Sequence, residues 1–406
     1  TTEIYTLSLH DALPIYGSHL ELMLGKMVAY LFCLFPVERV LSSSIISQFN
    51  DRAATPLGER KEVIKGQRGG DDSIEADLHL NNPPVPHSII RYSAVKQTML
   101  VFARQRCYTC PMQIMRWPVI GVKMPKVRTL EALDAFLAKV QGQGFDAVEM
   151  SLEMFPFIID GNICSAWVDA VEPVLARYPL LYSAHIGRGL DLRNLENHEL
   201  HASVLRSSLQ ICHVLHMDIL VLHYEVKTNN LKAERQFLDA HRWAADLAGR
   251  LGVTLAVENI EVELVEPVVA LMDQIRHPNL KLNLDTGHAY LASKRFGFDF
   301  LEAVKQMAPH LCHMHLNDNT GRFEELRITD RLAYDCLSMS HRREFGRGDI
   351  HIPPFFGSVP FDQVFSLVQS YQGRFICEYA YEDFEPFNQA IGEKVRSRLL
   401  ASRSLL

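Results

Sequence analysis

The sequence is poor in cysteine, has no long apolar run and carries no excess of basic residues. Its 8 cysteines among 406 residues are scattered, most of them within apolar stretches, so we expect reduced thiols in a cytoplasmic protein rather than a disulfide framework. The longest apolar run near the N-terminus, 27–37, is much shorter than the roughly 20 residues that span a bilayer. We therefore expect neither a membrane span nor a membrane partner.

Basic charge is also scarce. The formal net charge is −7, with 41 Lys and Arg against 48 Asp and Glu, and the acidic excess lies after residue 117. Proteins that bind DNA or RNA hold the phosphate backbone with clustered lysine and arginine, and an acidic surface repels it. We therefore do not expect a nucleic acid partner.

The composition changes near residue 117. Residues 1–15 resemble translated adapter sequence, and 50–88 are rich in Gly, Pro, Asp and Arg without sustained periodicity, which is typical of an unstructured segment. We therefore expect 1–117 to be a poorly structured N-terminal extension, disordered or artefactual. The expected folded domain is 118–396, and 397–406 is expected to be a C-terminal tail.

From residue 118 onward, short β-rich apolar runs alternate with amphipathic stretches. The predicted strands are 119–123, 147–151, 181–185, 219–223, 254–258, 280–285, 312–316 and 375–379. The clearest predicted helices are 130–141, 202–215, 232–251 and 300–307. This alternation is typical of an α/β protein with a (β/α)8 barrel, or TIM barrel. A doubly wound open sheet is the alternative, but the first strand lacks the glycine-rich turn that usually follows it in that fold.

Six consecutive predicted strands, the third to the eighth, end in a side chain that can bind a metal. These side chains are His185, His223, Glu258, Asp285, His315 and Glu378. In a barrel the carboxyl ends of the strands meet at one mouth, so residues far apart in the sequence come together there. A single residue of this kind is commonly a hydrogen-bonded rim residue, but six in succession predict a metal site.

Other polar residues extend this pattern. His288 follows the sixth predicted strand across a glycine turn, which presents it beside the same mouth. His313 shares a strand face with His315 but lies deeper, so we expect it to be structural. Asp349 and His351 alternate along an extended segment, which places both side chains on one side of it.

The predicted ligands are carboxylate oxygens and imidazole nitrogens. This mixed set suits Mn²⁺, Mg²⁺, Co²⁺ or Zn²⁺, and the lack of thiolate ligands argues against a structural cysteine–zinc site. A divalent ion of this kind polarises a carbonyl group or activates water. The expected cofactor is therefore one of these divalent metals.

Four motifs carry a resemblance to a known family. They read Leu-Ala-Val-Glu-Asn at 255–259, Leu-Asp-Thr-Gly-His at 284–288, His-Met-His-Leu-Asn-Asp at 313–318 and Phe-Ile-Cys-Glu-Tyr at 375–379. Together with the loop at 351–361, they resemble the xylose isomerase-like TIM barrel superfamily. That superfamily includes sugar phosphate isomerases and epimerases, and also the endonuclease IV-like proteins of AP endonuclease family 2.

The resemblance to the epimerase branch implies one divalent ion with four ligands. These ligands would be Glu258, Asp285, His315 and Glu378. Glu258 and Glu378 would also be the catalytic pair, one removing a proton from the substrate and the other returning it through an enediolate, and carboxylates with tuned pKa values suit that chemistry. His288 and His185 would contact the substrate.

The endonuclease IV branch is the main alternative. The resemblance to it implies a three-zinc cluster that cleaves phosphodiesters at abasic sites in DNA, and every ligand position of that cluster has a match here. The matching residues are His185, His223, Glu258, Asp285, His288, His315, Asp349, His351 and Glu378. A dehydratase or lyase on the same barrel is a third alternative, because an enediolate can also eliminate water.

The loop after Glu258 favours the isomerase over the nuclease. It contains Glu261, Glu263 and Glu266, which would repel a polyanion. We therefore expect a divalent-metal-dependent sugar or sugar phosphate isomerase or epimerase, acting on a small polyhydroxy carbonyl compound. Barrels of the kind that the chain resembles often pair, which leaves a homo-oligomer open.

Overall fold

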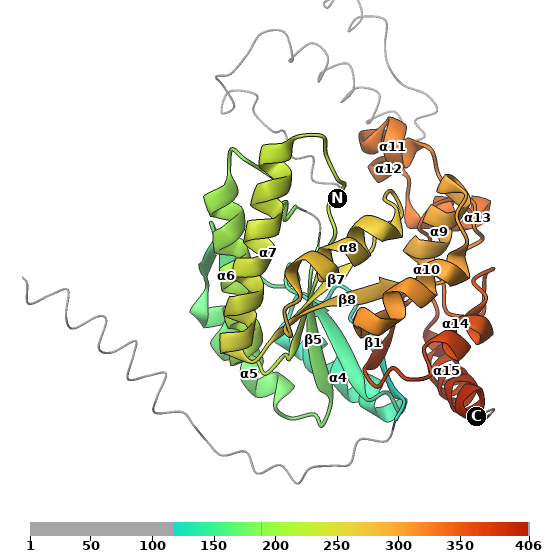
Figure 1. Ribbon diagram of the computed structural model, residues 1–406. Coiled ribbons are helices and arrows are strands. Elements are labelled where there is room, and N and C mark those ends of the chain that lie inside the picture. The colour runs from blue at the N-terminus through green and yellow to red at the C-terminus, as the bar shows by residue number, and fades with distance from the viewer. Residues whose placement is uncertain (1–116, 188, 405–406) are drawn as a thin grey trace, which may run out of the picture. The chain divides into compact units, whose positions relative to one another are not determined.

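Eight short strands pair in parallel and close into a barrel, with helices between successive strands (Figure 1). The structure is a computed structural model that describes residues 117–187 and 189–404. Of the N-terminal segment expected at 1–117, only Trp117 belongs to the described residues, and the interpretation of 1–15 lies outside them. The predicted TIM barrel is confirmed.

The strands follow one another around the barrel in the order β1-β10-β9-β8-β7-β6-β5-β2. Their bounds are β1 Val119–Lys123, β2 Ala147–Ser151, β5 Leu181–Ile186, β6 Ile219–His223, β7 Thr254–Glu258, β8 Leu280–Asp285, β9 Leu311–Leu316 and β10 Arg374–Cys377. The predicted bounds agree at β1, β2, β6, β7 and β8 and differ by one or two residues elsewhere. A separate hairpin, β3 Ile158–Ile159 with β4 Asn162–Ile163, follows β2.

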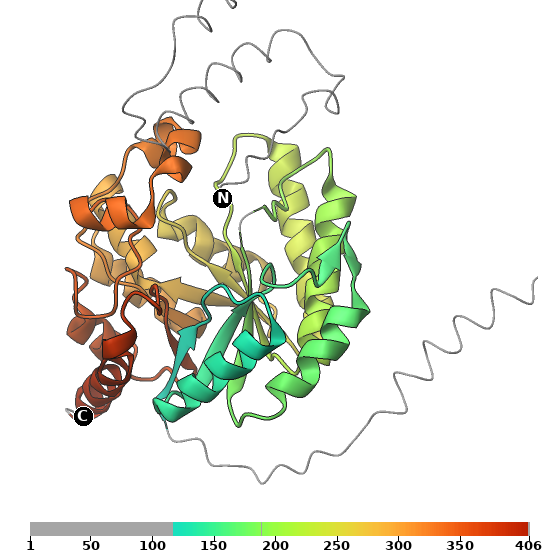
Figure 2. The same cartoon turned by 180° about the vertical axis from the view of Figure 1, so that it is seen from behind.

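Helices cover the outer face of the barrel, with α6 and α7 on one side and α14 and α15 on the other in both views (Figures 1 and 2). The covering helices are α4 Leu130–Gly142, α5 Ser165–Leu175, α6 His198–Val214, α7 Leu231–Leu251, α8 Val265–Ile275, α9 Thr286–Phe296, α10 Phe300–Met307, α14 Phe361–Leu367 and α15 Asn388–Arg403. Two short 3-10 helices are Ala308–His310 and Glu385–Phe387. The domain boundary expected at residue 396 falls inside α15.

The longest of these helices, α7, shows how the local sequence sets an element. Asn230 caps its start by accepting hydrogen bonds from the amides of the first turn, and Gly252 ends it with a left-handed φ of 68°, which glycine adopts without steric cost. Phe237 and Ala244 lie on its buried face, toward the strands. The amphipathic pattern of the sequence therefore produces the helix and also fixes which face it packs against the barrel.

Side chains inside the barrel change from apolar to polar along the strands. An apolar layer of Val119, Ala147 and Ile376 packs in the interior near the start of the strands. The barrel is so narrow here that a Cβ added at Gly121 would lie 2.6 Å from Ile376 Cδ1 and 2.7 Å from the carbonyl oxygen of Ala147. This packed layer fills the interior near the strand starts, and the polar residues lie toward the strand ends.

The long connection between β9 and α14 lies at this mouth and carries three short helices. They are α11 Leu326–Thr329, α12 Arg331–Cys336 and α13 Met339–Phe345, and α11 and α12 lie at the top of both views (Figures 1 and 2). Within residues 117–187 and 189–404, no helix combines the length and the apolar character needed to cross a membrane.

The packing of β10 against the outer helices gives a test of the core. Phe375 is fully buried and its ring centroid lies 5.1 Å from that of Tyr371 and 6.2 Å from that of Phe365. We expect Phe375→Ala to lower the free energy of unfolding by about 3–5 kcal/mol, because it leaves a cavity in this cluster. Phe387→Ala is the control, since Phe387 is 53% exposed. Chemical denaturation of both variants measures the difference, and equal losses would contradict the packing described.

Candidate metal centre

The barrel brings the six predicted strand-end residues to one mouth. His223, Glu258 and Asp285 are the last residues of β6, β7 and β8. His185 and His315 are one residue from the ends of β5 and β9, and Glu378 directly follows β10. Because parallel strands end at the same rim, six residues spread over almost 200 positions become neighbours.

Four of these residues form a compact cluster, here called the four-ligand group: Glu258, Asp285, His315 and Glu378. Their ligand atoms lie within 4.8 Å of one another, and all four side chains are buried. Nδ1 of His315 lies 2.6 Å from Oε2 of Glu378, 3.2 Å from Oε2 of Glu258 and 3.8 Å from Oδ2 of Asp285. The carboxyl ends of four neighbouring strands, β7 to β10, thus direct three carboxylates and one imidazole at a common point.

Three atoms that face this point have no hydrogen-bond partner among the described residues. They are Oδ2 of Asp285, Nδ1 of His315 and Oε2 of Glu378. The Glu258 oxygen on this side, Oε2, accepts a hydrogen bond from Asn283 at 3.0 Å. The contact between His315 and Glu378 is short but is not aligned as a hydrogen bond. Buried polar atoms are normally paired, so three unpaired atoms that converge fit a divalent cation with oxygen and nitrogen ligands.

The charges of the four-ligand group also favour a cation. The pKa of Asp285 is raised to about 8, mainly by burial; His288 opposes this effect, and the neighbouring Glu378 and Glu258 carboxylates add to it. Burial by itself raises the pKa of Glu258 and Glu378, but the facing imidazoles, above all that of His315, hold both well below their usual range. Three carboxylates in a buried cluster repel one another unless positive charge lies between them.

A second group consists of His185, His223 and Glu258. Nε2 of His185 lies 3.3 Å from Oε2 of Glu258, and Nε2 of His223 lies 3.6 Å from its Oε1. Burial lowers the pKa of His223 to about 3, which leaves its imidazole neutral, the form that binds metals. Glu258 therefore belongs to two groups of potential ligands and lies between them.

A third group consists of His288, Asp349 and His351. Nε2 of His351 and of His288 lie 2.7 Å and 3.4 Å from Oδ2 of Asp349. Nδ1 of His288 lies 3.0 Å from the carbonyl oxygen of Asn259, and Nδ1 of His351 lies 3.1 Å from that of Glu378. A carbonyl can only accept, so each Nδ1–H donates and each Nε2 is left as a potential metal ligand.

Two arginines hold the segment that carries the third group. Arg342 donates to the carbonyl oxygen of Asp349 at 3.2 Å, and Arg343 donates to that of Ile350 at 3.1 Å. His351 has a φ of 44°, in the left-handed region that residues with a Cβ rarely adopt. Strained backbone of this kind persists where the surroundings enforce it, and it is common at functional sites.

A small cavity lies over the second and third groups. It measures about 180 Å³, and its lining includes His223, Glu225, Glu261, His288, Arg327 and Arg331. Arg327, from α11, forms an ion pair with Glu261 after β7, so the β9–α14 connection reaches across the mouth. A larger, mostly apolar cavity of about 510 Å³ lies between the loops after β2 and β5 and helix α6, and none of the predicted ligands lines it.

Sequence reasoning missed two charged residues inside the barrel. Lys123, the last residue of β1, forms an ion pair with Oε1 of Glu378. Glu149, in the middle of β2, lies 3.0 Å from Nε2 of His315. The signal that could have found both is a charged side chain on the inward face of an otherwise apolar strand. His313, expected to be structural, lies below His315 and is fully buried.

The comparisons with known proteins agree with the fold. The sequence matches the family described as "Xylose isomerase-like TIM barrel" over residues 137–400. A xylose isomerase-like TIM barrel protein from Mycobacterium smegmatis, solved in complex with magnesium, is 16% identical, with 70% of this chain and 97% of that chain covered and a TM-score of 0.53. A xylose isomerase domain protein from Planctomyces limnophilus is 13% identical, with 70% and 98% covered and a TM-score of 0.51.

Sugar epimerases are among the other similar structures. A D-tagatose 3-epimerase-like protein is 16% identical, with 68% of this chain and 99% of that chain covered and a TM-score of 0.49. No curated protein matches the sequence. Likeness at this level of identity shows the fold, so the function has to be argued from the site itself.

Metal binding gives a direct test of the grouping. We expect Asp285→Asn to weaken the tightest Co²⁺ equivalent by at least roughly 100-fold, because it removes a ligand of the four-ligand group rather than an outer partner. His351→Asn is the matched control and is expected to leave that equivalent nearly unchanged, because it alters only the third group. Titration of the metal-free proteins with Co²⁺, followed by absorption and by elemental analysis, measures both. Equal weakening in the two variants would contradict the separation of the groups.

Proposed function

Because the chain belongs to the xylose isomerase-like TIM barrel family, we propose that it is a divalent-metal-dependent isomerase or epimerase of a sugar, a sugar phosphate or a similar small polyhydroxy carbonyl compound. One observation carries this proposal. Two buried glutamates, Glu258 at the end of β7 and Glu378 after β10, lie far apart in the sequence but meet in one group with Asp285 and His315. Paired carboxylates beside a cation site are what proton transfer next to a carbonyl group requires.

The four-ligand group would hold the ion, and its buried, unpaired atoms on Asp285, His315 and Glu378 would be ligands together with Glu258. A divalent metal bound there would polarise the substrate carbonyl and stabilise negative charge on its oxygen. A similar structure has been solved with magnesium. The oxygen and nitrogen ligands of this chain are equally suited to Mn²⁺, Co²⁺ or Zn²⁺.

The two glutamates have unequal surroundings, which suggests their roles. The Lys123 ammonium pairs with Glu378 and favours its ionised form, so we assign Glu378 as the base that takes the proton from the carbon next to the carbonyl group. The electron pair of that C–H bond moves into an enediolate. Glu258 would first take up a proton through the imidazoles that surround it. In an epimerase it would then deliver this proton to the other face of the same carbon. In an isomerase the proton would go to the neighbouring carbon, and a second proton would move from one enediolate oxygen to the other.

Histidines around the glutamates would contact the substrate. His288 lines the cavity of about 180 Å³, so its ring is available to substrate hydroxyls. His185 is only 3% exposed and faces Glu258, so we assign it a weaker part in substrate binding. The small cavity and the ion pair of Arg327 with Glu261 across the mouth favour a small molecule over a nucleic acid.

Hydrogen exchange with solvent tests the proton transfer. Incubated in D₂O with a panel of ketoses and their phosphates, the metal-loaded protein is expected to introduce deuterium at the carbon next to the carbonyl group of its substrate, which NMR detects. Glu378→Gln is expected to lower turnover by at least about 10²–10⁴-fold, because it removes the base. Turnover without deuterium incorporation, or activity that survives Glu378→Gln with the metal bound, would contradict the proposal.

A second candidate function is hydrolysis of a phosphate ester. The observation that favours it is the assembly of His185, His223, Glu258, Asp285, His288, His315, Asp349, His351 and Glu378 into three groups of potential ligands, two of which share Glu258. Proton transfer requires only the four-ligand group, whereas a cluster of several ions suits phosphoryl chemistry, in which both attacking and leaving oxygens need stabilisation.

The third group distinguishes the two functions. If the protein is an isomerase, Asp349→Asn should leave deuterium exchange largely intact. If it is a phosphoesterase, the same substitution should abolish hydrolysis of bis(p-nitrophenyl) phosphate and of DNA with an abasic site. Assays of wild type and Asp349→Asn on both kinds of substrate, with metal content measured in parallel, decide between them. Hydrolysis by the wild type without deuterium exchange would replace the first proposal by the second.

A further inference from the structure

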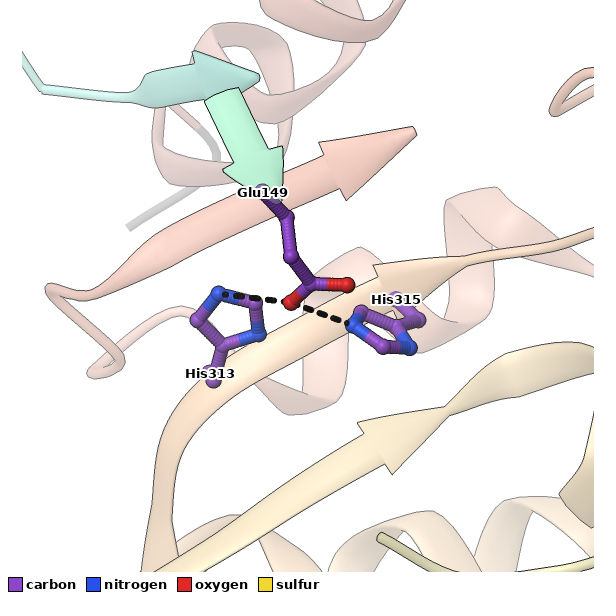
Figure 3. Close-up of side chains that lie close together, drawn as sticks. All are labelled: Glu149, His313 and His315. Carbon is purple, nitrogen blue, oxygen red and sulfur yellow. Dashed lines mark hydrogen bonds and ion pairs between the residues drawn. The ribbon is translucent and has the colours of Figure 1, made fainter. Parts of the chain in front are cut away.

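A fully buried carboxylate lies beneath the four-ligand group and is not one of its members. Glu149 lies in the middle of β2. The neighbours of β2 in the barrel are β1 and β5, but the Glu149 side chain contacts β9, which is not adjacent to β2. Figure 3 shows its carboxylate pointing toward His313 and His315, which extend from β9. Oε2 of Glu149 lies 3.0 Å from Nε2 of His315 and 3.6 Å from Nε2 of His313.

We propose that Glu149 is a positioning residue of the metal centre, which fixes the His315 ring so that Nδ1 faces the four-ligand group. Its carboxylate accepts a hydrogen bond from Nε2–H of His315. An ionised carboxylate can only accept, so this contact places a proton on Nε2 and leaves the Nδ1 lone pair available in the neutral ring. Nδ1 is the atom that faces Glu258 and Glu378.

His313 does not share this role. Its Nδ1 lies 3.1 Å from Oδ1 of Asn283, whose amide nitrogen donates to Glu258 at 3.0 Å, so the amide orientation is fixed and Nδ1 of His313 must donate. Nε2 of His313 is then the acceptor for the Ser183 hydroxyl at 3.2 Å. Within the described part of the chain, His315 is therefore the hydrogen-bond partner of the Glu149 carboxylate.

The burial of Glu149 is hard to explain by packing alone. Its side chain is fully buried, and Oε1 has no hydrogen-bond partner among residues 117–187 and 189–404. A barrel interior that needed only to be filled would hold an apolar side chain here, because an ionised carboxylate is costly to bury.

A carboxylate behind a ligating histidine is a common support of metal sites. It fixes the ring orientation and tautomer and raises the basicity of the nitrogen that binds the metal, and its loss typically weakens metal binding 10–100-fold. This inference rests on the metal-binding part of the proposed function and not on the reaction. Metal binding to the protein therefore tests it without any substrate.

The decisive variant is Glu149→Gln, which keeps the shape of the side chain and removes its charge. We expect it to bind the tightest Co²⁺ equivalent about 10–100-fold more weakly than the wild type, with an altered Co²⁺ absorption spectrum. Ser183→Ala is the control at the same depth, because it removes a buried hydrogen bond to His313 without touching a ligand. Its Co²⁺ affinity and spectrum should match those of the wild type. Thermal denaturation confirms that each variant is folded.

A double-mutant cycle separates positioning from a general loss of stability. If Glu149 acts through His315, adding Glu149→Gln to His315→Asn should not weaken Co²⁺ binding further. Should Glu149→Gln fail to fold, Glu149→Asp tests the same contact, because it keeps the charge but withdraws the oxygen from His315, and the same weakening is expected.

Three results would overturn the inference. Wild-type Co²⁺ affinity in folded Glu149→Gln would show that the contact does not position His315. Additive losses in the cycle would show that Glu149 acts by another route. Loss of one whole metal equivalent in both Glu149→Gln and His313→Asn, with the remaining equivalents unchanged, would make Glu149 a ligand. By contrast, a wild-type protein that binds no divalent ion would overturn the proposed function itself, so the two failures can be told apart.

Discussion

The structure depends on the burial of several carboxylates at one end of an apolar barrel. Glu258, Asp285 and Glu378 end their strands within one cluster, and Glu149 lies beneath it. Like charges in a medium of low dielectric constant repel one another strongly, so the surrounding positions have to supply positive charge or protons. The inward imidazoles and the Lys123 ammonium meet this need in part, and a divalent cation at the unpaired atoms of the four-ligand group would meet the rest.

The polar interior has two levels with different tasks. The upper level consists of the strand-end residues that face the mouth and supply potential ligands. The lower level contains Glu149, which contacts His315, and Asn283, which donates to Glu258 and is contacted by His313. Because the contact of Glu149 with His315 joins β2 to β9, which are not neighbours in the barrel, closure of the barrel and orientation of this ligand depend on each other. Precise orientation matters because a ligand that rotates freely binds a metal weakly.

The third group differs from the other two in how it is built. His288 starts α9, but Asp349 and His351 belong to the long connection that follows β9, and Arg342 and Arg343 hold that connection through its backbone. A barrel can therefore keep the same strand-end ligands while the loops add or remove further ones. Because strand ends and loops supply different ligands, proton transfer and phosphate ester hydrolysis are both compatible with the same strand-end residues. The chemistry therefore cannot be assigned from the fold.

The sequence by itself determined the barrel and the rim on which the site lies, because alternation in runs such as Leu280–Asp285 is a local property that decides which side chains face inward. It also placed every residue of the three groups near that rim. Tertiary structure alone decided that Glu149 lies against His315, that Lys123 pairs with Glu378 and that Arg327 spans the mouth to Glu261. Each of these contacts joins strands or loops that are not adjacent in sequence, and their distances follow from barrel closure and loop packing, which no local pattern encodes.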